Sequence, residues 1–260
     1  MLRKGITLIC ISRNNYKQIK DTFLSINNSI LENKKLIQIL HIDKSNIPKS
    51  SYNIGKNLLN DYSYEFIIQK SNGIFNAFNE GLKLVKTEYV FFLNTGDKLW
   101  KKNSLQIILN EVTKNRKKDI IYFDCVKLKD KKFITKKSSR NIFKCLIPFS
   151  IEFPCHQSCI FRTEIHRGII YPNNIGGDEF VIRHFLSRSI LKSTSQYCSE
   201  PICLYDLSGI SSAHKISYME FFNRSLGYIK LMLFHRIISD LLKIYPFYFL
   251  RKRLLIILRR

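Results

Sequence analysis

Residues 72–97 read NGIFNAFNEGLKLVKTEYVFFLNTGD, and this stretch decides the fold. Phe78 and Leu82 lie one helical turn apart, so its first part predicts a helix with one buried face. Residues 89–93 (YVFFL) form a continuous apolar run, which is typical of a strand buried on both sides. The polar residues 94–97 follow directly. The stretch therefore predicts a helix, a central strand and a polar loop at the carboxyl end of that strand.

The same alternation extends to both sides of this stretch. Short apolar runs predict strands over residues 6–11, 36–42, 65–69, 89–93 and 120–126. Helical patterns occupy residues 19–30 and 105–112, and Asn103 or Ser104 is placed to cap the second of these helices. A polar stretch containing Pro48 leads to the third strand. Alternating strands and helices predict an α/β fold with a mostly parallel sheet flanked by helices.

Polar side chains follow each of the first four predicted strands. These groups are Ser12, Arg13 and Asn14; Asp43; Ser71, Asn72 and Gly73; and Asn94, Thr95, Gly96 and Asp97. In such sheets ligands bind beyond the carboxyl ends of the strands. Each group alone also suits an ordinary turn, which is the alternative at every position. Four groups at one edge favour a binding site.

The chain has 260 residues and a formal net charge of +23, from 43 Lys and Arg against 20 Asp and Glu. This length predicts one domain with an appendage, and 45% hydrophobic residues exclude a disordered polycation. Residues 113–144 carry twelve Lys and Arg with three Asp, and residues 221–260 carry nine with one Asp. We expect the first segment to lie on an exposed face beside the sheet. The charge predicts an anionic partner, either nucleic acid, an acidic membrane or a phosphorylated small molecule.

Seven cysteines without regular spacing do not indicate a disulfide framework. Cys155, His156 and Cys159 lie close together, but no second ligand pair follows at a zinc-site spacing, so we favour free thiols in a reducing cytoplasm. Residues 1–12 imitate a signal peptide, yet polar residues follow at once and favour a first strand. No run reaches the ~18 apolar residues of a membrane-spanning helix, so we expect a soluble or peripheral protein.

Residues 72–97 resemble the signature of family 2 inverting glycosyltransferases with the GT-A fold, of the bacterial surface-polysaccharide type. Those enzymes commonly show Gly-Ile-Tyr-Asp-Ala-Met-Asn-x-Gly at the helix start, where this chain has Gly-Ile-Phe-Asn-Ala-Phe-Asn-Glu-Gly. After the strand they show Leu-Asn-Ser-Gly-Asp, where this chain has Leu-Asn-Thr-Gly-Asp. The resemblance extends weakly from Ile6 to about Ser212. It implies a catalytic domain over residues 1–212, with a nucleotide-sugar-binding half (1–112) and an acceptor half (113–212), followed by a basic amphipathic helical tail (213–260).

The resemblance assigns the strand ends to a nucleotide-sugar donor. Asp97 is expected to bind a divalent cation, Mg²⁺ or Mn²⁺, whose other ligands are diphosphate and water; a helix-entry turn role is the alternative. The family often has two acids here and this chain has one, which argues against tight metal binding without the donor. Asp43 is expected to hydrogen-bond the nucleotide base, in competition with a turn role. The further expected donor contacts are Ser12, Asn14, Asn72, Gly73, Asn76, Asn79 and Asn94.

The second half is expected to bind the acceptor and to supply a general base. Residues 175–186 (IGGDEFVIRHFL) resemble the family's motif of an acid followed by an amphipathic helix. This resemblance makes Asp178 the base that deprotonates the attacking hydroxyl, with Glu179 as the second candidate. Either could instead be an ordinary acid in the first turn of a helix. Expected contacts with the acceptor or diphosphate are His156, for which a structural role is equally open, and Gln157, Arg183 and His214.

Residues 221–260 interleave aromatic and aliphatic side chains with clustered Lys and Arg, which suits an interfacial segment on anionic lipid. A basic helix packed on the domain is the alternative. The predicted function is inverting transfer of a sugar to a glycan or glycolipid acceptor in synthesis of a cell-surface polysaccharide (lipopolysaccharide, O-antigen or capsule). The predicted location is the inner face of the cytoplasmic membrane.

Two other function classes are compatible with parts of the sequence. A basic nucleic-acid-binding protein would share the charge, but the chain has no zinc-finger, RNA-recognition or helix-turn-helix pattern, so we expect no nucleic-acid partner. A non-catalytic protein with the same fold would share the motif while having lost part of the metal site. The sequence gives no indication of the oligomeric state.

Overall fold

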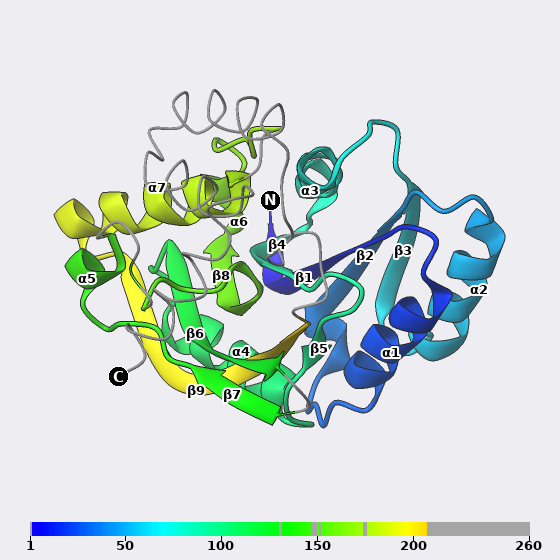
Figure 1. The fold of residues 1–260 in the computed structure, drawn as a ribbon, viewed down its shortest axis with the longest axis horizontal. Helices are drawn as coiled ribbons and strands as arrows, with labels where there is room; N and C mark the ends of the chain where they lie inside the picture. The colour runs from blue at the N-terminus through cyan, green and yellow to red at the C-terminus, as the bar shows by residue number, and fades with distance from the viewer. Residues whose placement is uncertain (1, 130–131, 147–149, 151, 174–175, 207–260) are drawn as a thin grey trace, which may run out of the picture.

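The computed structural model describes residues 2–129, 132–146, 150, 152–173 and 176–206, and is centred on a nine-stranded sheet. The strands are β1 Arg3–Ser12, β2 Ile37–Asp43, β3 Ser63–Ile68, β4 Thr87–Phe92, β5 Lys98–Leu99, β6 Ile120–Lys129, β7 Lys132–Lys136, β8 Cys159–Arg162 and β9 Ser195–Asp206. Their order in the sheet is β3-β2-β1-β4-β8-β6-β9-β5, and β7 pairs with β6 (Figure 1).

Helices cover both faces of the sheet. They are α1 Tyr16–Asn27, α2 Pro48–Leu58, α3 Ile74–Leu84, α4 Ser104–Lys114, α5 Ile142–Leu146, α6 Thr163–His166 and α7 Gly177–Lys192, with short 3₁₀ turns η1 Lys34–Leu36 and η2 His156–Ser158. One buried apolar cluster joins the sheet to α1 and α4, through Phe23 and Ile108 among others. A second cluster joins the opposite face to α3 and α7, through Phe78 and Phe185. The core is therefore two apolar layers separated by the sheet.

The parallel part of the sheet is its first half. β1 pairs parallel with both β2 and β4, and β2 pairs parallel with β3. The carboxyl ends of these four strands consequently lie at one edge. The second half is mixed, because β8 runs antiparallel to β4 and β6, β7 runs antiparallel to β6, and β9 runs parallel to β6.

Helix α2 corrects the expectation of a polar connection after the second strand. Pro48 stands at the start of the helix, where its missing N–H removes no intrahelical hydrogen bond. The buried residues of α2 are Ser51 and Gly55, and a Cβ on Gly55 would lie 2.0 Å from the Tyr64 hydroxyl. Ile54 and Leu58, one turn apart, also pack against the core while partly buried. The apolar pattern is therefore present, but Pro48 and Gly55 in the same stretch favoured a loop and the helix was missed.

Other expectations have smaller corrections or fall outside the described residues. Asn103 occupies the cap position of α4 without a side-chain cap hydrogen bond, and the Ser104 hydroxyl instead accepts from the Lys101 N–H at 3.0 Å. His214 and the predicted tail, residues 213–260, lie outside the described residues. Within the described residues, no helix combines the length and the apolar character needed to cross a bilayer.

Candidate functional site

The ends of β1 and β2 are joined by a buried polar network around Asp43. One oxygen of the Asp43 carboxylate accepts hydrogen bonds from the hydroxyls of Ser12, at 2.5 Å, and Ser45, at 2.7 Å. The other accepts from the Ser45 N–H at 3.1 Å. Burial lowers the pKa of the adjacent His41 to about 4, so this ring is neutral at pH 7. Asp43 has no exposed surface in this arrangement, so contact with a nucleotide base requires its loop to move.

Asn14 links the loops that follow these same two strands. Its backbone is in the left-handed region, with φ of 55°, which Asn tolerates better than most residues. Its N–H donates to the Ser45 hydroxyl at 2.8 Å, and its side-chain oxygen accepts from the Asn46 N–H at 2.7 Å. The predicted donor contacts Ser12, Asn14 and Asp43 thus lie together, as parts of one hydrogen-bonded edge.

The loop after β4 holds Asp97 against α1. Gly96 has φ of +105°, a conformation that favours glycine. The Thr22 hydroxyl accepts from the Gly96 N–H at 3.0 Å and donates to the Asp97 carbonyl at 2.7 Å. Asp97 is only 5% exposed, and the Asn94 side-chain oxygen is buried without a hydrogen-bond donor among the described residues. The loop therefore carries two side chains with oxygen atoms, Asn94 and Asp97, on a backbone that is held by Thr22.

These oxygens suit a cation that brings most of its ligands with it. Within the described part of the chain, no group of three or more His, Cys, Asp or Glu side chains is arranged to hold a metal ion. Mg²⁺ prefers oxygen ligands and commonly binds through one or two carboxylates plus substrate phosphates and water. The Asp97 carboxylate and the Asn94 amide oxygen fit that pattern, so a Mg²⁺ or Mn²⁺ ion would be held largely by the substrate.

The start of α3 forms a second part of the candidate site. Gly73 precedes the helix with φ of +96°, and Asn72 is exposed beside it. The Asn76 side-chain amide donates to the Asn72 carbonyl at 2.7 Å. The exposed helix start leaves backbone N–H groups that favour an anion.

Asn79, one turn further along α3, is engaged within the protein. Its amide donates to the Tyr171 carbonyl at 2.9 Å, and its oxygen accepts from the Tyr171 N–H at 2.9 Å. The Phe75 and Tyr171 rings stack with centroids 5.9 Å apart and planes 8° from parallel. Asn79 therefore ties α3 to the segment that precedes α7, and its amide is not available to a donor in this conformation.

Two glycines allow α7 to begin directly beside α3. Gly176 is left-handed with φ of +95°, and a Cβ on Gly177 would lie 2.7 Å from the Pro172 carbonyl oxygen and 3.3 Å from the Phe75 ring. Asp178 follows in the first turn and is half-buried. The start of α3 and Asp178 are thereby brought together, although about 100 residues separate them in the chain.

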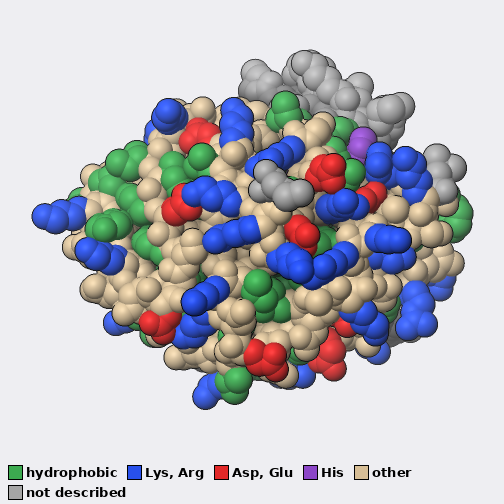
Figure 2. Space-filling model, turned by 180° about the vertical axis from the view of Figure 1, so that it is seen from behind, with side chains coloured by type: hydrophobic (Ala, Val, Ile, Leu, Met, Phe, Trp, Pro, Cys, Tyr) green, Lys and Arg blue, Asp and Glu red, His purple; other side chains and the backbone are tan. Residues whose placement is uncertain are grey.

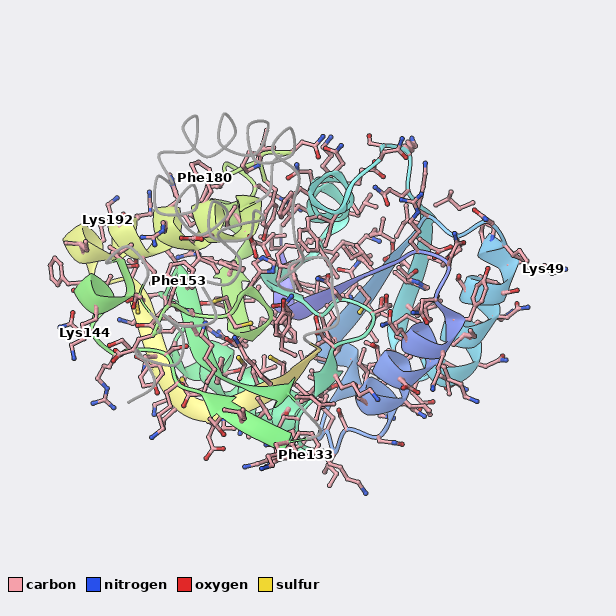
Figure 3. The ribbon with its side chains drawn as sticks, in the orientation of Figure 1. Lys49, Phe133, Lys144, Phe153, Phe180 and Lys192 are labelled. Atoms are coloured by element: carbon pink, nitrogen blue, oxygen red, sulfur yellow. The ribbon has the colours of Figure 1, made fainter. Side chains whose placement is uncertain are left out.

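Glu179, the second candidate base, is held by its own helix. Its carboxylate accepts from the Arg183 Nε at 2.9 Å, and it is 5% exposed. Arg183 also donates to the Leu146 carbonyl at 2.7 Å and lies 4.9 Å from the centre of the Phe153 ring, which Figure 3 labels below α7. Glu179 is thus paired within α7, and Arg183 links α7 to the Leu146 carbonyl and the Phe153 ring.

His156 lies inside the second apolar cluster. Its Nε2 is 2.7 Å from the Tyr171 hydroxyl, and His166 Nε2 is 3.0 Å from the same hydroxyl. Burial lowers the pKa of both histidines to about 3, so both are neutral at pH 7. This favours the structural alternative for His156. The neighbouring Gln157 accepts from the Cys155 thiol at 3.2 Å.

Tyr171 is a connecting residue that sequence reasoning missed. It contacts α3 through Asn79, η2 through His156 and α6 through His166, while its ring stacks on Phe75. No local pattern marks it, because its hydrogen-bond partner Asn79 is 92 residues away in the chain.

Of the two cavities described here, one lies far from these residues and one lies beside them. A cavity of about 730 Å³ is lined by Leu2, Lys86 and Glu88 among others, at the starts of β1 and β4, and so lies at the opposite edge from Asp97. A pocket of about 130 Å³, lined in part by Gln18 and Gly96, lies beside the Asp97 loop. Figure 2 shows Lys and Arg side chains spread over the back of the molecule, with Asp and Glu side chains among them.

Comparison with known proteins identifies a matching family and similar solved structures. The family model described as glycosyl transferase family 2 matches residues 7–184. The crystal structure of S. aureus TarS 1–349 in complex with UDP has a TM-score of 0.63 and 15% identity, covering 92% of this chain and 65% of that one. The mannosyltransferase PcManGT from Pyrobaculum calidifontis, in complex with GDP-Man and Mn²⁺, has a TM-score of 0.57 and 12% identity, covering 82% and 60%. Comparison with curated proteins gives no match.

These likenesses confirm the predicted α/β architecture of the GT-A glycosyltransferases. At such identities they show the fold alone. The chain spans 36% of the length of the longer TarS chain that it matches and 65% or less of the other similar structures named above.

Proposed function

Because the chain belongs to glycosyl transferase family 2, we propose that it transfers a sugar from a nucleotide diphosphate-sugar to a hydroxyl group of a glycan acceptor. The observation that carries this proposal is the Asp97 loop at the carboxyl edge of the parallel strands, beside the ends of β1 and β2. The solved complexes support the donor class, since TarS is seen with UDP and UDP-GlcNAc and PcManGT with GDP-Man.

The donor side of the proposed site uses the first half of the chain. Asp97 and Asn94 face the diphosphate, and the N–H groups at the start of α3 offer a second set of contacts for its negative charge. A bound Mg²⁺ or Mn²⁺ would offset the charge that develops on the leaving diphosphate. The network around Asp43 joins the loops after β1 and β2 beside the proposed nucleoside position, and a direct contact between Asp43 and the base requires this loop to open.

The transfer step proposed is a single displacement with inversion. The acceptor oxygen forms a bond to the anomeric carbon while the bond from that carbon to the phosphate oxygen breaks. Asp178 takes the proton of the attacking hydroxyl, and the nucleoside diphosphate leaves with the bonding electrons. The Gly176-Gly177 pair and the Phe75–Tyr171 stack position Asp178 at the start of α7.

We further propose that the acceptor is a lipid-linked glycan of a cell-surface polysaccharide such as lipopolysaccharide, O-antigen or capsule. The proposal includes binding at the inner face of the cytoplasmic membrane. Its support is the composition of residues 221–260, where basic side chains alternate with aromatic and aliphatic ones.

The proposed function is tested by binding and turnover of UDP- and GDP-sugars with and without Mn²⁺. A bound donor raises the apparent stability by mass action, so melting temperatures report binding. Asp97→Asn should abolish the part of the melting-temperature shift that depends on Mn²⁺. The same change should also abolish turnover. Asp61→Asn, at an exposed aspartate paired with Lys34, should leave both unchanged. Survival of both metal-dependent binding and turnover in Asp97→Asn would show that the site is wrongly assigned.

A further inference from the structure

Lys127 on β6 and Lys136 on β7 point to the same side of the sheet. Lys136 is directly opposite Cys125 in the antiparallel pair, and Cys125 and Lys127 share a face because side chains alternate along a strand. The two lysines are therefore diagonal neighbours across the strand pair. Both are half-buried, whereas Lys137, the next residue, is exposed.

No carboxylate among the described residues forms an ion pair with either lysine. Lys127 Nζ lies 5.9 Å from the centre of the Tyr205 ring, and Lys136 Nζ donates to the Phe153 carbonyl. Burial lowers the pKa of Lys127, and repulsion from Lys136 lowers it further. Two half-buried like charges without an acid are unfavourable, and a bound anion would offset this cost.

The lysine pair borders the candidate site from the acceptor half. Cys203 on β9 is opposite Cys125 in the sheet, and burial together with the nearby charge of Asp97 contributes to the raised pKa of Cys203, about 11. The nearby Cys125 thiol is also the largest cause of the raised pKa of Cys155, directly before His156. Buried cysteines thus lie between Asp97 and the face of β6 that carries Lys127.

The lysines lie on strands that are linked to the Asp97 loop through the sheet. β5, which begins directly after Asp97, pairs with β9, and β9 pairs with β6. The sheet curls here, because the Trp100 ring directly after β5 lies 5.2 Å from the Phe133 ring on β7. Lys127 and Lys136 belong to the second half of the chain, to which the proposed function assigns the acceptor.

We propose that Lys127 and Lys136 form a binding site for a phosphate ester carried by the acceptor. The acceptor role rests on the proposed function, because only a transferase has an acceptor to place there. Two ammonium groups on the same face of adjacent strands provide charge-assisted donors for phosphate oxygens. The chemistry recognised is that of a phosphate monoester or diester, and the donor's diphosphate is the competing source of the same group.

The test uses sn-glycerol 3-phosphate as the probe, by titration calorimetry of the full chain without divalent cations. K127Q and K136Q should each weaken binding about tenfold, since a hydrogen bond to a charged group is lost, and the double variant should weaken it further. The matched control K137Q, which removes an exposed neighbouring charge, should stay within twofold of the wild type. UDP and GDP, titrated with Mn²⁺, should bind all variants within twofold of the wild type and so show that each is folded.

Three results would overturn the proposal. The first is a wild type that does not bind glycerol 3-phosphate, and the second is equal affinity in the double variant and the wild type. The third is an equal loss of UDP or GDP affinity in a folded variant, which would assign the lysines to the donor diphosphate. A different outcome separates the two proposals: the wild type binds neither UDP nor GDP, while K127Q and K136Q bind glycerol 3-phosphate more weakly than the wild type. In that case the phosphate site stands and the proposed function fails. If the double variant does not fold, the single variants decide.

Discussion

Replacing Asn79 by alanine tests whether this residue holds α3 to the segment before α7. The change removes both hydrogen bonds to the Tyr171 backbone, each 2.9 Å long. Tyr171 is 1% exposed, so water does not replace the lost partners of its N–H and C=O groups. Leaving a buried polar group unsatisfied costs roughly 1–3 kcal/mol, and for two partly buried bonds we expect a loss of about 2–4 kcal/mol in the free energy of unfolding.

Urea unfolding followed by circular dichroism measures this loss, and Asn76→Ala is the matched control. Asn76 is the same residue type one turn earlier on α3, and its amide bonds only the exposed Asn72 carbonyl. Its replacement should cost less than about 0.5 kcal/mol, as usual for surface positions. The reasoning is refuted if the two variants are equally stable, or if Asn79→Ala keeps its stability and loses affinity for UDP and GDP, as a direct donor contact would.

Three further predictions concern the base, the buried histidines and the tail. Asp178→Asn should reduce turnover by about 10²–10⁴ while the dissociation constant of the donor stays within twofold, and parallel loss of both would place Asp178 in the donor site. His41, His156 and His166 have pKa values lowered to about 4, 3 and 3, so the folded state binds fewer protons than the unfolded state below pH 6.5. Stability should be complete above pH 7.5 and fall by up to about 4 kcal/mol per pH unit between pH 6 and 5 in urea titrations, and constant stability over that range would contradict the assignment. Deleting residues 221–260 should release the protein from phosphatidylglycerol vesicles without loss of UDP or GDP binding, and continued vesicle binding would exclude an interfacial tail.

The elements that sequence predicted well are those with strong apolar patterns. The run at residues 89–93 forms β4, and the helical pattern at Phe78 and Leu82 forms α3. Both were predictable because the spacing of apolar residues indicates which faces of an element are buried. The placement of polar residues at the ends of β1, β2 and β4 followed from the parallel order alone. Helix α2 was missed because Pro48 and Gly55 favour a loop and its fully buried residues, Ser51 and Gly55, are small, although Ile54 and Leu58 pack against the core one turn apart.

Roles within the site were less predictable than positions. Asn79 and His156 have the residue types of ligand contacts, and both bond Tyr171 instead. A polar side chain binds whatever donor or acceptor the fold brings to it, and that partner is set by tertiary packing. Glu179 pairs with Arg183 because the two residues lie four positions apart on α7, which places their side chains side by side.

The charge of residues 113–144 shows why the exposed-face expectation was too simple. Lys117 and Lys137 are exposed, in line with that expectation, whereas Lys127 and Lys136 are half-buried on one face of the β6–β7 pair. Their direction depends on strand register, and a shift by one residue would turn each strand's side chains to the other face. Register is set by pairing between β6, β7 and β9, which no local charge count contains. A variant that moves Lys127 by one residue along β6 should keep the net charge and weaken binding of glycerol 3-phosphate, and unchanged binding would count against the proposed phosphate site.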